Sequence, residues 1–155
     1  MAKEGDQAPN FKLSDDAGTT VQLSKFKGKP VVLYFYPKDD TTGCTAEAKD
    51  FSFLADDFAR AGAEIIGVSP DSSASHAKFK TKHDLTVRLV ADTDTSTAEA
   101  YGVWVEKSMY GKTYMGVERA TFLIDAKGKI VRSWRKVKVP GHAAEVLDAV
   151  NALKS

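Results

Sequence analysis

The spacing of hydrophobic positions along this chain changes several times, and the changes predict an alternation of strands and helices. The run "PVVLYFY" (30–36) is continuously apolar and rich in β-formers, a pattern typical of a central strand buried on both faces. Residues 44–61 then place apolar side chains three and four positions apart, which predicts a helix that ends at Gly62. The run "EIIGVS" (64–69) predicts the next buried strand.

In the rest of the chain, polar turns also separate short strands and helices. The pieces "FKL" (11–13) and "TVQL" (20–23) flank a polar turn and predict an N-terminal β-hairpin. Beyond residue 70 we expect a helix over 73–85, a strand over 87–92, a short helix over 95–103 capped by Ser or Thr, a hairpin pair over 120–125 and 129–137, and an amphipathic helix over 141–155.

These elements predict an α/β sandwich with a mixed central sheet flanked by helices. The 155 residues are 43% hydrophobic and 28% charged, as in an ordinary globular protein. A chain of this length buries about 70% of its unfolded surface as one domain. We find no internal repeat or linker-like stretch, and therefore expect a single domain over residues 1–155.

Charge and motif content exclude several classes of function. The chain has 22 Lys and Arg against 21 Asp and Glu, so we expect neither nucleic acid nor a membrane as a partner. The first residues lack the apolar core of a signal peptide and no apolar run reaches membrane length, which predicts a cytoplasmic protein. No glycine-rich nucleotide motif occurs, and we expect no cofactor.

The only cysteine, Cys44, lies in a suggestive place. A single thiol excludes an internal disulfide and a cysteine-based zinc site, so we expect no metal. Cys44 follows a buried strand and begins a helix, where first-turn N–H groups and the helix dipole stabilise a thiolate. Thr41 and Thr42 are suitable capping residues, and Gly43 allows a close backbone approach. From these residues alone, an inert buried thiol remains an open alternative.

Other thiol chemistries fit the sequence less well. A Cys/His hydrolase needs a histidine base near the thiol, and we expect His76, His83 and His142 to be surface or cap residues. A thioredoxin-type motif needs a second cysteine at position 47, which is Glu47.

Several segments resemble one known family. The loop "YPKDDTTGCT" (36–45) resembles the P-x-x-x-T-x-x-C active-site loop of the peroxiredoxins, and "VERATFLID" (117–125) resembles the segment that carries their active-site arginine. Four further segments, "GDQAPNFKL", "YGVW", "MYGKTYMG" and "WRKVKVPGH", are similar to the bacterioferritin-comigratory-protein class, also called peroxiredoxin Q. The likeness covers nearly the whole chain.

The resemblance implies a thioredoxin-like fold and thiol-dependent reduction of hydrogen peroxide and organic hydroperoxides. Cys44 resembles the peroxidatic nucleophile that becomes a sulfenic acid. Thr41 resembles the residue whose hydroxyl holds the thiolate and the peroxide together. Arg119 resembles the guanidinium that stabilises the thiolate and the charge developing on the leaving oxygen. Pro37 resembles a residue that shields the site from water, and Glu47 a carboxylate that orients the arginine.

In a thioredoxin-like sheet, the strand over 120–125 would run antiparallel to 30–36. The start of one strand would then lie beside the end of the other, which would bring Arg119 next to Cys44.

The chain departs from this class at positions where relatives place a resolving cysteine. Lys49 stands five residues after Cys44, and "KFKTKH" (78–83) contains no cysteine either. We therefore expect a one-cysteine monomer that depends on an outside thiol such as thioredoxin, glutaredoxin or glutathione. We also expect Lys49 to be solvent-exposed. The segment "MYGKTYMGV" (109–117) predicts a mobile rim over the site or a plain connecting loop.

Two rival functions use the same fold. In a binding or structural module Cys44 would be inert, with an ordinary thiol pKa and no reactivity toward peroxide. In a redox sensor, oxidised Cys44 would pass a disulfide to a client protein in place of catalytic turnover.

Overall fold

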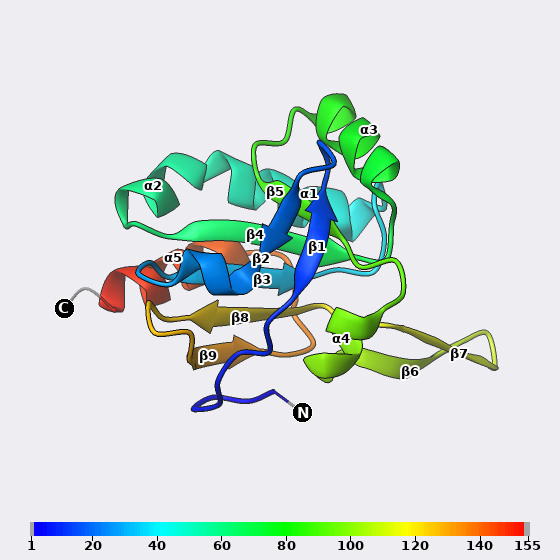
Figure 1. The fold of residues 1–155 in the computed structure, drawn as a ribbon. Coiled ribbons are helices and arrows are strands. Elements are labelled where there is room, and N and C mark those ends of the chain that lie inside the picture. Colours follow the sequence, from blue (N-terminus) through cyan, green and yellow to red (C-terminus); the bar gives the residue numbers. More distant parts are fainter. Residues whose placement is uncertain (1, 154–155) are drawn as a thin grey trace.

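A mixed seven-stranded sheet organises the protein (Figure 1), and the computed structural model describes residues 2–153. The strand order is β2-β1-β5-β4-β3-β8-β9. The strands are β1 (Lys12–Asp15), β2 (Thr20–Gln22), β3 (Val31–Phe35), β4 (Glu64–Ser69), β5 (Arg88–Ala91), β8 (Ala120–Ile124) and β9 (Ile130–Trp134). The predicted N-terminal hairpin is β1–β2, and the predicted C-terminal hairpin is β8–β9.

Strand β3 is a central strand of the sheet, and its pairing brings two distant segments together. All five of its residues are buried, as the apolar run predicts. It pairs in parallel with β4 and antiparallel with β8. The register sets Phe35 opposite Ala120, so the end of β3 lies beside the start of β8.

Helices cover the sheet on both faces and enclose two apolar cores. The helices are α1 (Thr42–Phe53), α2 (Ala55–Arg60), α3 (Ser73–His83), α4 (Ser96–Ala100) and α5 (His142–Ala152), with a short 3₁₀ helix at Leu23–Phe26. Tyr34 of β3 belongs to the core formed with α1, α2, α3 and α5. Its neighbour Phe35 belongs to the opposite core, which includes Tyr101 after α4. Adjacent strand residues face opposite sides, so one apolar run fills both cores.

The helix predicted over 44–61 is two helices. Helix α1 begins two residues earlier, at Thr42, and Leu54 interrupts it with φ −94° and ψ 6° before α2 begins. Hydrophobic spacing did not register the break because Phe51 and Phe58 keep helical spacing across it and both are fully buried.

The segment around residue 110 is a β-hairpin, so the expectation of a plain connecting loop is wrong, while mobility over the site stays a prediction. Strands β6 (Trp104–Met109) and β7 (Lys112–Val117) form a separate two-stranded antiparallel sheet that projects from the body (Figure 1). Tyr110 and Gly111 turn the chain with φ 53° and 77°, the positive angles of a tight hairpin turn.

The N-cap residue of α4 is a threonine, as predicted, but the capping hydrogen bonds come from another residue. Thr95 occupies the N-cap position, but its side chain accepts no capping hydrogen bond. The buried carboxylate of Asp92 accepts the N–H groups of Thr97 and Ala98 instead, at 3.1 and 2.8 Å. Local helix propensity does not predict this cap, because Asp92 follows strand β5 and lies outside the helix. Within residues 2–153, no helix has the length and apolar content needed to cross a membrane.

Candidate active site

Cys44 lies in the first turn of α1, directly beyond the carboxyl end of β3, and is 1% exposed. The N–H of Thr45 donates to the carbonyl of Thr41 at 2.8 Å and closes this turn. The thiol therefore lies at the positive end of a helix dipole, a position that stabilises an anion. Ligands in open α/β sheets also bind at this edge.

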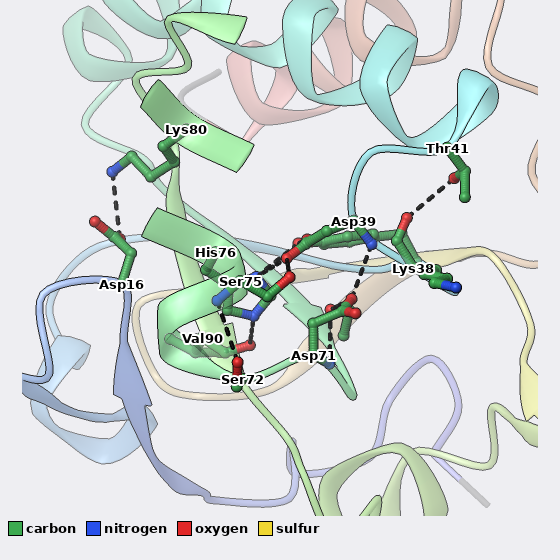
Figure 2. Close-up of polar contacts among 12 residues, drawn as sticks. Asp16, Lys38, Asp39, Thr41, Asp71, Ser72, Ser75, His76, Lys80 and Val90 are labelled. Atoms are coloured by element: carbon green, nitrogen blue, oxygen red, sulfur yellow. Dashed lines mark hydrogen bonds and ion pairs between the residues drawn. The ribbon is translucent and has the colours of Figure 1, made fainter. Parts of the chain in front are cut away.

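Thr41 is the N-cap residue of α1, but it does not cap through its side chain. Its hydroxyl donates to the carbonyl of Lys38 at 3.0 Å, which tightens the loop before the helix (Figure 2). Thr42 is the first helical residue instead of a cap. Pro37 begins the same loop and is half-buried.

Arg119 reaches the thiol from a segment 75 residues away in sequence. It directly precedes β8, whose start lies beside the end of β3. Its Nη2 donates to Cys44 Sγ at 3.2 Å. Gly43 leaves room for this approach, because a Cβ there would lie only 3.1 Å from Nη2.

Glu47 anchors the other side of the guanidinium. Its Oε1 accepts a hydrogen bond from Arg119 Nη1 at 2.6 Å, and its side chain is 1% exposed. Burial raises the pKa of Glu47 to about 7, and the nearby Arg119 charge only partly offsets that effect. Burial lowers the pKa of Arg119, but Glu47 and Cys44 together raise it above its ordinary value, so the guanidinium stays charged.

One lysine lies within electrostatic reach of the thiol, and another is exposed on the helix that carries the thiol. Lys49 is exposed on α1, as predicted from its place five residues after Cys44. Lys107 of β6 was not singled out from the sequence. Burial lowers its pKa, as does the charge of Arg119, while Cys44 opposes the change. The hairpin therefore lies within electrostatic reach of the thiol, which no local pattern could have shown.

The histidine predictions were wrong for two of three residues. His76 is 0% exposed and His142 is 5% exposed, each held by interior hydrogen bonds. His142 Nε2 lies 2.8 Å from Thr121 Oγ1, while His83 at the end of α3 bonds the exposed Asp40. Sequence reasoning missed His76 because its lysine neighbours suggested a solvated face, whereas it shares a side of α3 with buried Phe79.

The assembled groups favour nucleophilic chemistry at sulfur. A guanidinium and a helix N-terminus converge on Sγ, and both supply positive potential there. The described part of the chain contains no cluster of His, Cys, Asp or Glu that could hold a metal ion. No histidine in residues 2–153 hydrogen-bonds to Sγ, and a hydrolase arrangement is therefore not formed there.

Known proteins are similar to this chain in both sequence and fold. A family model described as AhpC/TSA matches residues 4–133. The chain therefore belongs to the AhpC/TSA family, and its relatives within that family are peroxiredoxins of the Bcp, or PrxQ, class. Peroxiredoxin Bcp of Bacillus subtilis is 53% identical over 146 residues, which cover 94% of this chain and 93% of that protein.

Solved structures extend the likeness to three dimensions. PrxQ of Xylella fastidiosa, with a cysteine replaced by serine, superposes with a TM-score of 0.95 at 40% identity over 100% of this chain and 99% of that one. The bacterioferritin comigratory protein of Xanthomonas campestris, described for its alkyl peroxide reduction activity, gives 0.89 at 46% identity, covering 94% and 92%. The thioredoxin-like fold and the peroxiredoxin resemblance predicted from the sequence are confirmed.

Proposed function

We propose that this protein is a thiol peroxidase that reduces hydrogen peroxide and organic hydroperoxides at Cys44. The observation that carries the proposal is the 3.2 Å hydrogen bond from Arg119 Nη2 to Sγ at the N-terminus of α1. Membership of a peroxiredoxin family supports the same activity, and one relative is described for alkyl peroxide reduction.

The proposed reaction transfers one oxygen to sulfur. The Cys44 thiolate attacks one peroxide oxygen, the O–O bond breaks, and the other oxygen leaves as water or an alcohol after taking a proton. Sulfur is oxidised to a sulfenic acid and the peroxide is reduced. Arg119 stabilises the thiolate and the charge on the leaving oxygen, and Glu47 holds the guanidinium in place.

Thr41 and Pro37 complete the proposed site. The Thr41 hydroxyl lies at the entrance of α1 and can turn from the Lys38 carbonyl toward a bound peroxide. Pro37, half-buried at the start of the loop, limits the access of water to the thiol.

Thiol ionisation alone cannot account for a fast peroxidase. An unperturbed thiol is about 3% ionised at pH 7, so full ionisation increases its rate by about thirty-fold at most. Intrinsic nucleophilicity falls as the thiol pKa falls, which reduces even that gain. The remaining acceleration comes from donors placed in advance for the transition state, the role proposed for Arg119 and Thr41.

Regeneration requires a second thiol from outside the chain. Cys44 is the only cysteine, and Lys49 stands where an internal partner could otherwise form a disulfide. The proposed reductant is thioredoxin, glutaredoxin or glutathione, and the proposed setting is the reducing cytoplasm. We propose that residues 1–155 act as one domain and as a monomer.

The test is the second-order rate at which the reduced protein consumes hydrogen peroxide near pH 7, followed by fluorescence of Trp104 and Trp134. We expect a rate far above that of a free thiolate. Arg119→Ala should lower it by a factor of about 100 to 1,000, the usual effect of removing a transition-state donor. Arg60→Ala, which changes a guanidinium on α2, is the matched control.

A wild-type rate that thiolate fraction alone explains would overturn the proposal and favour the binding-module alternative. Rapid oxidation followed by disulfide transfer to a client protein, without turnover by small-thiol systems, would favour the redox sensor.

A further inference from the structure

A buried polar cluster joins the loop before Cys44 to helix α3. We call it the Asp39 cluster; it comprises Tyr36, Asp39, Ser75 and His76. His76 is 0% exposed and Asp39 is 7% exposed. Their side chains meet at 2.8 Å, between His76 Nδ1 and Asp39 Oδ2 (Figure 2). Among residues 2–153 no member of the cluster hydrogen-bonds to Sγ, and the cluster is joined to the thiol by the loop that runs from Tyr36 to Cys44.

Hydrogen bonds occupy both ring nitrogens of His76. Its Nε2 lies 2.9 Å from the carbonyl of Val90, which can only accept, so Nε2 carries a hydrogen. Asp39 accepts from the Tyr36 hydroxyl at 2.6 Å and from the Ser75 hydroxyl at 2.8 Å. His76 Nδ1 lies 2.8 Å from Asp39 Oδ2. Both ring nitrogens are therefore engaged, one with the sheet and one with the loop.

The backbone of the same loop is anchored separately to the end of β4. The N–H of Asp39 donates to Asp71 Oδ2 at 2.8 Å, and that oxygen also accepts from the Ser69 hydroxyl at 2.6 Å. A buried polar group that loses its partner carries the full cost of its desolvation. Separation of the loop from α3 would therefore leave both Asp39 and His76 uncompensated.

The loop held in this way ends at the proposed catalytic groups. Asp40 has a φ of 60°, a left-handed conformation that is uncommon in non-glycine residues, although aspartate adopts it more readily than most. The next residue, Thr41, bonds back to the Lys38 carbonyl and begins the turn that carries Cys44. A shift of Asp39 is transmitted to both groups within five residues of chain.

We propose that Asp39 and His76 are positioning residues for the peroxide reaction. They hold residues 37–41 against α3, and so keep the Thr41 hydroxyl and the Cys44 thiol in their reactive positions beside the guanidinium. This inference rests on the proposed peroxidase function, which it deepens by assigning a second group of residues to the same site.

Substitution of either partner tests the proposal. Asp39→Ala and His76→Ala should each lower the second-order rate with hydrogen peroxide by about 100-fold, the effect of misplacing reacting groups by about 1 Å. The double variant should lose no more than either single variant, because each substitution removes the same interaction. Asp39→Asn should retain most of the rate, since its amide can donate to His76 Nδ1 while its oxygen accepts from Tyr36.

The rate of Cys44 alkylation by iodoacetamide provides a readout that moves in the opposite direction. Release of the loop exposes a thiol that is 1% exposed in the intact protein, so alkylation should accelerate in the Ala variants while peroxide reduction slows. A simple loss of thiolate would slow both reactions. The alkylation readout also stands if wild-type protein proves slow with peroxide, which separates failure of this inference from failure of the proposed function.

Lys80→Ala is the matched control on the same helix. Lys80 joins α3 to Asp16 in the β1–β2 turn at 3.3 Å, away from the loop before Cys44 (Figure 2). Its loss should leave both rates unchanged.

Circular dichroism and the melting temperature establish that each variant is folded. If His76→Ala does not fold, Ser75→Ala removes one donor to Asp39 without opening a large cavity and should produce smaller changes in the same directions. Folded variants with wild-type rates of both peroxide reduction and alkylation would overturn the proposal.

Discussion

At the scale of single residues, Glu47 shows how this site holds a charge that its surroundings disfavour. The carboxylate is buried on α1 and bonds Arg119 at 2.6 Å, yet burial raises its pKa to about 7. Its other oxygen, Oε2, has no hydrogen-bond partner among the described residues. The desolvation free energy of the carboxylate therefore exceeds the stabilisation that a single guanidinium provides.

This pKa predicts that wild-type stability falls as the pH rises from about 4.5 to about 7. Across that interval the folded protein retains a proton on Glu47 that the unfolded chain has lost, so the free energy of unfolding decreases with pH. The full loss is about 3 kcal/mol. Glu47→Gln should remove this slope and be more stable than wild type at pH 8, as measured by urea unfolding at several pH values.

The same substitution should slow peroxide reduction by about ten-fold, because a neutral amide holds the guanidinium less firmly. Glu145→Gln, at an acid of α5 that is 56% exposed, is the control and should preserve the wild-type pH dependence. If the free energy of unfolding varied with pH in the same way for wild type and Glu47→Gln, the raised pKa of Glu47 would be contradicted.

At the scale of elements, the β6–β7 hairpin depends on two consecutive residues with positive φ. Gly111 adopts such an angle without steric cost, but Tyr110 does so as a non-glycine residue. The Tyr110 side chain is 97% exposed, so packing does not compensate for the strain.

Tyr110→Asn should stabilise the hairpin by about 0.5 kcal/mol, because asparagine tolerates the left-handed region. Gly111→Ala should destabilise it by about 1 kcal/mol for the converse reason. Amide hydrogen exchange within β6 and β7 measures the local opening free energy for both variants. Equal protection in the two variants would show that the turn does not control the hairpin.

At the scale of the whole molecule, side chains of the two neighbouring strands, β3 and β5, leave no room at Gly67. A Cβ at this position of β4 would lie 2.7 Å from the Tyr34 ring and 2.8 Å from Leu89 Cδ2. Tyr34 in turn stacks on Phe51 of α1, with ring centroids 4.7 Å apart. A disturbance in the middle of the sheet thus reaches the helix that carries the thiol.

Gly67→Ala should therefore lower the free energy of unfolding by about 1 to 3 kcal/mol through overpacking. Tyr34→Phe removes a buried hydroxyl that has no partner among residues 2–153, and should cost little by itself. The double variant should recover part of the loss, since the hydroxyl lies 2.8 Å from the added Cβ. Strictly additive effects in urea unfolding would argue against the contact.

Local sequence predicts some of these features and leaves others open. The apolar run at 30–36 predicted β3 because five consecutive buried residues require a strand covered on both faces. The break at Leu54 escaped prediction because one non-helical residue leaves the surrounding hydrophobic spacing unchanged. The hairpin at 104–117 escaped it because β6 and β7 expose most of their side chains and lack a buried face.

The sequence by itself determined that the protein has one thiol, that this thiol lies at the start of a helix after a buried strand, and that no internal disulfide can form. Local propensity and residue identity are sufficient for those features. Only the tertiary structure decided which groups surround the thiol. Arg119 reaches it because β8 runs antiparallel to β3, and Asp39 meets His76 because α3 packs against the loop. Such contacts join residues 37 to 75 positions apart, and the packing of the sheet and helices determines them.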